Sequence, residues 1–195
     1  ISEGKDIINL GIGQPDFPTP TNIQEAAIKA IKDGHHGYTP SNGILALREA
    51  VSEQIHSNYN VNISPDQILI TPGGKPTIFY SSLILGGEEN EIIYPDPGFP
   101  IYRSMINFSG AKAIPLQLSE KDDFEINVDK LEKLITNKTS LIILANPNNP
   151  TGSFMSQSKI DRIAKMLEKY PDVFILSDEI YSKIIFNDKK MPSFL

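Results

Sequence analysis

The sequence predicts an α/β fold, a three-layer α/β/α sandwich around a mostly parallel sheet. Strand-like and helix-like segments alternate about five times from residue 68 onward, and this alternation is typical of parallel strands joined by helical crossovers. The candidate strand at 140–144 is apolar at nearly every position. Such a strand suits a parallel sheet, because helices bury both of its faces.

Before residue 68 we expect an extended arm and two helices. Residues 6–20 are rich in Gly, Pro and Asp, which indicates turns and extended chain. Thr21 can cap a first helix, in which apolar residues recur at helical spacing until Gly34 ends it. A second amphipathic helix is expected over 44–55.

From residue 68 the expected strands and helices follow in turn. We expect strands at 68–70, 91–94, 111–118, 140–144, 173–176 and 184–186, and helices at 76–85, 99–108, 128–135 and 160–170. In sheets of this kind ligands bind beyond the carboxyl ends of the strands. The loops that follow residues 70, 94, 144 and 176 are therefore expected to hold the functional residues.

The composition excludes several classes of function. The chain has 195 residues, a net charge of −6 and no Cys. The negative charge argues against nucleic-acid binding, and no apolar run approaches the roughly 18 residues that a membrane span needs. Without Cys there are no disulfides or Cys-ligated metals, and the three His residues lack metal-ligand spacing. We therefore expect no metal, no nucleic-acid or membrane partner, and a cytoplasmic location.

The first two loops contain residues that suit an anionic, planar ligand. Gly73, Gly74 and Lys75 precede a helix, where glycines let backbone N–H groups approach an anion. Paired glycines in this place are more often a simple turn. Prolines around Phe99 would present its ring rigidly, either to stack on a planar ligand or to cap the core.

The last two loops contain an amide and a carboxylate. Two Asn-Pro pairs fix the backbone around Asn149, although Asn and Pro are also common turn residues. Asp178 ends a buried strand, and a carboxylate there is costly unless it meets a cation. That cation is either the partner in a structural salt bridge or the ring nitrogen of a cofactor.

Five strings of residues occur in one order along the chain, at 11–17, 73–75, 97–102, 146–152 and 178–181, and between the first two lie the spaced residues Tyr38, Gly43, Leu47 and Arg48. Each string alone is a weak signal, but together they are specific. They resemble the class I/II aminotransferase family, pyridoxal-phosphate (PLP) enzymes of the aspartate aminotransferase fold, known as fold type I. The resemblance covers almost the whole chain.

The resemblance implies roles around the cofactor ring. Asp178 would pair with the pyridine nitrogen and keep it protonated, so that the ring withdraws electrons. Tyr181 and Asn149 would donate hydrogen bonds to the phenolic oxygen of the ring, and Phe99 would stack on it. Asp178, Tyr181 and Asn149 are therefore the expected catalytic residues.

Other matching positions imply contacts with the cofactor phosphate and the substrate. Gly73, Gly74 and Lys75 would hold the phosphate, and Tyr38 would reach the phosphate of the partner subunit, which implies a homodimer. The backbone of Gly13 would meet the substrate carboxylate, and the substrate would also contact Phe99 and Asn149.

The lysine that forms the family's Schiff base with PLP has no match in this sequence. In the family it lies some tens of residues beyond the position of Tyr181, and here only 14 residues follow. Lys183, Lys189 and Lys190 follow too closely, and Lys159 precedes Asp178 at the start of a polar helix.

The chain therefore resembles the amino-terminal half of an enzyme, truncated before that lysine. Residues 1–40 are expected to form an N-terminal arm and first helix, part of the small domain and the dimer contact. Residues 41–195 are expected to form the amino-terminal portion of the large PLP-binding domain, with the rest of that domain and the carboxyl-terminal small domain absent.

The expected activity of the parent protein is transfer of an amino group from an L-amino acid to a 2-oxo acid. Aspartate or an aromatic amino acid is the expected donor, and the chain by itself is expected to be inactive. One alternative is a PLP-dependent lyase of the same fold, such as a carbon–sulfur lyase or a cyclopropane-forming synthase, since fold and cofactor do not choose the reaction. The other alternative is a non-catalytic fragment.

Overall fold

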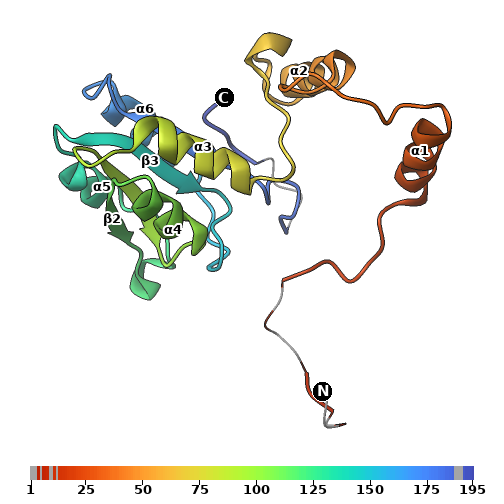
Figure 1. Ribbon diagram of the computed structural model, residues 1–195. Coiled ribbons are helices and arrows are strands. Elements are labelled where there is room, and N and C mark those ends of the chain that lie inside the picture. Colours follow the sequence, from red (N-terminus) through yellow and green to blue (C-terminus); the bar gives the residue numbers. More distant parts are fainter. Residues whose placement is uncertain (1–3, 5, 9–10, 12, 187–190) are drawn as a thin grey trace. The chain divides into compact units, whose positions relative to one another are not determined.

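The computed structural model describes residues 4, 6–8, 11, 13–186 and 191–195. The chain divides into two compact units, residues 1–41 and residues 42–195. The first contains helix α1 and the second contains the sheet with the remaining helices (Figure 1). Among the described residues, no helix combines the length and the apolar character that a membrane crossing needs.

Helix α1 (Thr21–Lys32) follows an extended segment in the first unit. The expectation that Thr21 caps this helix is wrong. Pro20 holds the cap position without a side-chain hydrogen bond, and its carbonyl accepts bonds from Ile23 N at 3.0 Å and Gln24 N at 3.1 Å. Proline before the first turn loses no N–H that a helix needs, so Thr21 becomes the first helical residue.

The described residues of the second unit form a four-stranded parallel sheet (Figure 1). The strands are β1 (Glu91–Asp96), β2 (Lys112–Gln117), β3 (Thr139–Ala145) and β4 (Phe174–Asp178). Their order is β2-β1-β3-β4, and each neighbouring pair is parallel. The prediction of a parallel sheet is therefore confirmed, and the strand order changes direction between β1 and β3.

Four helices of this unit cover the two faces of the sheet. Helices α3 (Lys75–Leu85) and α4 (Ile101–Phe108) lie on one face, and α5 (Val128–Leu134) and α6 (Gln157–Leu167) lie on the other. Helix α2 (Leu45–Tyr59) precedes them and contacts the 3₁₀ turn at Pro65–Gln67, and a second 3₁₀ turn lies at Glu120–Asp122. In Figure 1, α3 and α4 lie in front of the sheet. Each expected helix after residue 44 is present within a few residues of its predicted bounds.

Two core clusters show the three layers, because alternate residues of a strand point to opposite faces. On one face Ile93 and Ile142 pack with residues of α5 and α6. On the other face Ile92 and Leu141 pack with residues of α3 and α4. All four side chains are fully buried, so the three-layer α/β/α prediction is confirmed.

Two expected strands are absent from the described residues. The segment at 68–70 has one backbone hydrogen bond to a neighbouring segment, from Ile70 N to Asn42 O at 3.1 Å, and belongs to no sheet. The segment at 184–186 follows a turn that Ile184 N closes on Tyr181 O at 2.8 Å. A short apolar run becomes a strand only where another strand offers a hydrogen-bonding edge.

Helix α2 is held to its surroundings by a buried arginine. Arg48 is 7% exposed and donates hydrogen bonds to Gly43 O at 3.2 Å, Pro65 O at 2.7 Å and Asp66 Oδ1 at 3.2 Å. Gly43 has a φ of +96°, and a Cβ there would lie 2.5 Å from Cγ1 of Ile70. These contacts explain why an arginine and a glycine occupy this corner.

A buried carboxylate joins three segments at the start of β1. Glu91 is 8% exposed. Its Oε1 accepts a hydrogen bond from Lys112 Nζ at 2.8 Å, and its Oε2 accepts one from Thr136 Oγ1 at 2.7 Å. The bond from Lys112, and then the bond from Thr136, lower the pKa of Glu91 below its ordinary value of 4.5.

We expect Glu91→Gln to destabilise the protein at neutral pH and to weaken its acid sensitivity. A carboxylate whose pKa is lower in the folded state adds stability above its unfolded pKa, and this stability is lost as the pH falls through the folded pKa. The loss of the charged acceptor should cost about 1–3 kcal/mol at pH 7. Urea unfolding of both proteins at pH 7 and in acid below the ordinary pKa measures the difference, which should shrink in acid.

Glu89→Gln is the matched control, because Glu89 pairs with Lys138 at 3.3 Å while its side chain is 90% exposed. This substitution should change the free energy of unfolding by less than about 0.5 kcal/mol. Equal losses from the two substitutions would show that burial of Glu91 adds nothing.

Candidate active site

A cavity of about 170 Å³ opens beyond the carboxyl ends of the strands in the second unit. Its lining comes from the ends of β3 and β4, the loop after β1 and the first turn of α3. Six residues with predicted roles line it: Gly74, Lys75, Phe99, Asn149, Asp178 and Tyr181. The cavity lies where ligands bind in open parallel sheets.

Asp178 is the last residue of β4 and is half-buried. Its Oδ2 accepts a hydrogen bond from the hydroxyl of Tyr102 at 2.6 Å, and its Oδ1 accepts one from Ile180 N at 3.3 Å. The described residues give its side chain no salt bridge. Both explanations of this carboxylate, a structural salt bridge and a pairing with a cofactor ring nitrogen, therefore stay predictions.

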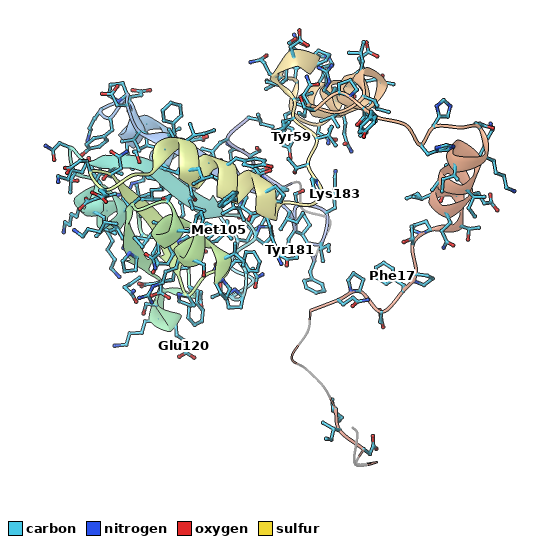
Figure 2. All side chains as sticks on the ribbon, viewed as in Figure 1. Phe17, Tyr59, Met105, Glu120, Tyr181 and Lys183 are labelled. Atoms are coloured by element: carbon cyan, nitrogen blue, oxygen red, sulfur yellow. The ribbon has the colours of Figure 1, made fainter. Side chains whose placement is uncertain are left out.

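Asn149 and Tyr181 meet at the cavity from two different loops. Asn149 lies in the loop after β3, and Tyr181 lies on the turn after β4 that also carries Lys183 (Figure 2). Asn149 Nδ2 donates a hydrogen bond to the hydroxyl of Tyr181 at 3.4 Å. An amide and a phenol are thus placed together, and both can donate to one ligand oxygen.

Phe99 lies between β1 and α4 and is half-buried at the cavity. Its ring meets the ring of Tyr102 edge-on, with centroids 5.8 Å apart and planes at 86°. It also packs against the core cluster beneath α3 and α4. The ring therefore caps the core and lines the cavity at the same time, so the two readings of Phe99 are compatible.

The amino terminus of α3 forms the edge of the cavity. Gly74 is the cap residue and Lys75 is the first residue of the helix. Gly73 precedes them with a φ of +85°, and a Cβ on Gly73 or Gly74 would meet no atom within 4 Å. Backbone N–H groups in the first turn of a helix have no partner inside the helix, and they attract anions.

Gly13 and Tyr38 belong to the first unit, and neither is among the residues that line this cavity of the second unit. Each is exposed within that unit. Lys159 lies at the start of α6 and pairs with Glu125, so it is engaged away from the cavity. Among the residues from 13 to 186 and the other described ones, no three His, Asp or Glu are grouped to hold a metal.

Sequence reasoning gave no role to Tyr102, although it lies in one of the strings that carry the resemblance. Its ring is 1% exposed in the first turn of α4. Burial, and then the hydrogen bond to Asp178, raise the pKa of the Tyr102 phenol far above its ordinary value of 10.0. The position three residues after Phe99 was visible in the sequence, but its contact with a residue 76 positions away was not.

Asn148 is a second residue near the cavity to which sequence reasoning gave no role. It is 6% exposed, and its Nδ2 donates hydrogen bonds to Pro97 O at 3.2 Å and to Thr151 Oγ1 at 2.8 Å. It therefore joins the loop that carries Phe99 to the loop that carries Asn149. Asn148 lies in the string at 146–152 that carries the resemblance, but its contacts with Pro97 and Thr151 could not be seen in the sequence.

Comparison with known proteins finds relatives over nearly the whole chain. A probable aspartate aminotransferase of Methanocaldococcus jannaschii is 40% identical over 184 residues, which are 94% of this chain and 48% of that protein. A probable aspartate/prephenate aminotransferase of Rickettsia felis is 38% identical over 187 residues, 96% of this chain and 46% of that protein. The chain thus spans about half the length of the curated relatives it matches.

A solved structure is similar over the same extent. The aromatic aminotransferase of Pyrococcus horikoshii OT3 matches with a TM-score of 0.92 and 33% identity, over 97% of this chain and 50% of that one. The family model of aminotransferase class I and II matches residues 5–194. The resemblance seen in the sequence is confirmed, and the chain belongs to the aminotransferase class I and II family.

Proposed function

We propose that the protein which contains this chain is a PLP-dependent aminotransferase that moves an amino group from an L-amino acid to a 2-oxo acid. The observation that carries the proposal is the convergence of Asp178, Asn149, Tyr181 and Phe99 on one cavity at the carboxyl end of a parallel sheet. The names of the relatives mention aspartate, prephenate and aromatic substrates. Aspartate or an aromatic amino acid is therefore the proposed amino donor.

The chemistry of the lining residues fits PLP. When bound, PLP supplies a conjugated pyridine ring that withdraws electrons from the reacting carbon of the substrate. Asp178 would hold a proton on the ring nitrogen, because a nearby carboxylate favours the charged form of a base. Asn149 and Tyr181 would donate hydrogen bonds to the phenolic oxygen of PLP. This role is supported by the distance of 3.4 Å between Asn149 Nδ2 and the hydroxyl oxygen of Tyr181.

Two further parts of the cavity suit the rest of the cofactor. Phe99 would cover one face of the cofactor ring, a role supported by the edge-on contact of the Phe99 ring with Tyr102. Backbone N–H groups of Gly74 and Lys75, with Gly73 shaping the turn, would bind the phosphate at the start of α3. The open space at both glycines supports a close approach of the phosphate.

The first unit is proposed to complete the site. Residues 1–40 would form an arm and helix that belong to the small domain and the dimer contact, and residues 41–195 would form the amino-terminal portion of the large domain. Gly13 would meet the substrate carboxylate through its backbone. Tyr38 would reach the cofactor phosphate of the other subunit in a homodimer. A cytoplasmic location stays a prediction.

The test of the proposed function is an assay of the full-length protein loaded with PLP. A panel of L-amino acids is offered with 2-oxoglutarate and with oxaloacetate, and the new amino acid is measured. Release of pyruvate or ammonia without a 2-oxo acid acceptor would favour the lyase alternative. The absence of both activities in a protein that binds PLP would contradict the proposal.

We expect Asp178→Asn to slow turnover strongly while much of the cofactor stays bound. An amide cannot hold the ring nitrogen protonated as a carboxylate does. Removing one partner of a buried charge pair costs about 3–5 kcal/mol, or roughly 10²- to 10⁴-fold in rate. Single-turnover kinetics with saturating PLP measure the rate, and the absorbance of bound PLP measures its retention.

Asp96→Asn is the matched control for this substitution. Asp96 is the last residue of β1 and accepts a hydrogen bond from Gln117 at 2.9 Å, but it does not line the cavity. Its substitution should change the rate by less than about threefold. Near-normal turnover of the Asp178 variant would remove this residue from the proposed role.

We expect Tyr38→Phe to weaken cofactor binding in the dimer, because the substitution removes one hydrogen bond to the phosphate. A hydrogen bond to a charged group contributes about 1.5–3 kcal/mol, or roughly ten- to a hundredfold in affinity. Fluorescence titration with PLP measures the dissociation constant. Tyr170→Phe is the control, because Tyr170 packs against the core cluster of α5 and α6. This substitution should leave the dissociation constant of PLP unchanged.

A mixed dimer tests whether Tyr38 acts across the subunit boundary. One protomer carries Tyr38→Phe and its partner carries Asp178→Asn. If Tyr38 serves the other subunit, one of the two sites has neither change and binds PLP with normal affinity. Weak binding or slow turnover at both sites would place Tyr38 in the site of its own subunit.

A further inference from the structure

Tyr102 links three elements of the second unit at a single side chain. It lies in the first turn of α4. Its hydroxyl donates a hydrogen bond of 2.6 Å to Asp178 Oδ2 at the end of β4. Its ring meets Phe99, in the loop after β1, edge-on. Tyr102 thus contacts both the carboxylate and the aromatic ring for which the proposed function gives cofactor roles.

The contact with Asp178 fixes the orientation of the carboxylate. Tyr102 holds Oδ2, and Ile180 N donates to Oδ1 at 3.3 Å. The terminal torsion of an aspartate is broad and roughly two-fold when nothing holds it. With each oxygen bound by a different donor, rotation of the carboxylate about this torsion costs a hydrogen bond. A bond between a phenol and a carboxylate is also charge-assisted, and therefore among the stronger ones.

The surroundings of Tyr102 keep its hydroxyl protonated and able to donate a hydrogen bond. Its side chain is 1% exposed and packs in the cluster that includes Ile106 and Leu141. The raised pKa of its phenol, caused first by burial and then by the bond to Asp178, keeps the hydroxyl protonated at neutral pH. A buried hydroxyl without a partner is costly, so the bond to Asp178 also satisfies Tyr102 itself.

We infer that Tyr102 is a positioning residue that orients the Asp178 carboxylate toward the cofactor ring and supports Phe99 at the ring's face. The inference rests on the proposed function, and it assigns Tyr102 no direct contact with substrate or cofactor. Its effect on the reaction passes through Asp178. Removal of the hydroxyl should therefore matter only while Asp178 is present.

The test compares Tyr102→Phe with Tyr94→Phe in the full-length protein. Tyr94 is a second buried tyrosine of the same cluster, and the charges that act on the pKa of its phenol are those of Arg103 and Asp96, whereas the hydroxyl of Tyr102 is bonded to Asp178. Each substitution removes one hydroxyl from a buried ring. Tyr102→Phe should raise the dissociation constant of PLP about tenfold, as expected for one hydrogen bond to a charged group. Tyr94→Phe should leave it within about twofold.

A double-mutant cycle with Asp178→Ala separates positioning from packing, and it uses the protein without cofactor. Tyr102→Phe should raise the equilibrium constant of unfolding about tenfold in the wild-type background. In the Asp178→Ala background it should raise it less than about threefold, because the acceptor is already gone. Circular dichroism of each variant checks that the fold is kept.

The outcomes distinguish the inference from the function on which it rests. Equal effects of Tyr102→Phe in the two backgrounds, or equal PLP affinities of the Tyr102 and Tyr94 variants, would overturn the inference. A wild-type protein that binds PLP but transfers no amino group would overturn the proposed function alone. In that case the unfolding cycle and the PLP titration would still decide the role of Tyr102.

Discussion

The parallel pairing of β3 with β4 is the constraint on which the candidate site depends. Ala145 and Asp178 are register partners at the ends of the two strands, and Asn146 N donates to Asp178 O at 2.9 Å. The two following loops therefore start from one point, which brings Asn149 to Tyr181. A slip of one residue would turn Asp178 to the opposite face of the sheet, away from α4.

Some buried polar groups at the carboxyl ends of the strands have hydrogen-bond partners, and others have none. Tyr102 and Asp178 satisfy each other, and Asn146 Oδ1 accepts a hydrogen bond from Met155 N at 2.8 Å. Among the described residues, three buried side-chain atoms lack a partner, and two of them, Asn146 Nδ2 and Asn148 Oδ1, lie in the loop after β3. Unpaired buried groups cost free energy, so this loop depends on its hydrogen bonds from Asn146 N to Asp178 O and from Asn148 Nδ2 to Pro97 O to keep its shape.

Most elements could be predicted because the apolar pattern of a buried strand or an amphipathic helix is local. The errors have two physical causes, a missing strand partner and a helix cap. The runs at 68–70 and 184–186 are as apolar as short strands, yet among the described residues neither lies beside a strand that could pair with it. Helix α6 begins three residues earlier than expected, because the Ser156 hydroxyl caps its first turn by accepting from Lys159 N at 3.4 Å.

The sequence by itself determined the fold class, the family and the loops that carry the candidate residues. These follow from apolar periodicity and from short strings whose order along the chain is specific, and both are local properties. Tertiary structure decided which residues share the cavity: Asp178 with Tyr102, Asn149 with Tyr181, and Phe99 with the start of α3. Those contacts depend on strand order, register and the packing of α4, which bring together residues up to 76 positions apart, and no local pattern encodes such a distance.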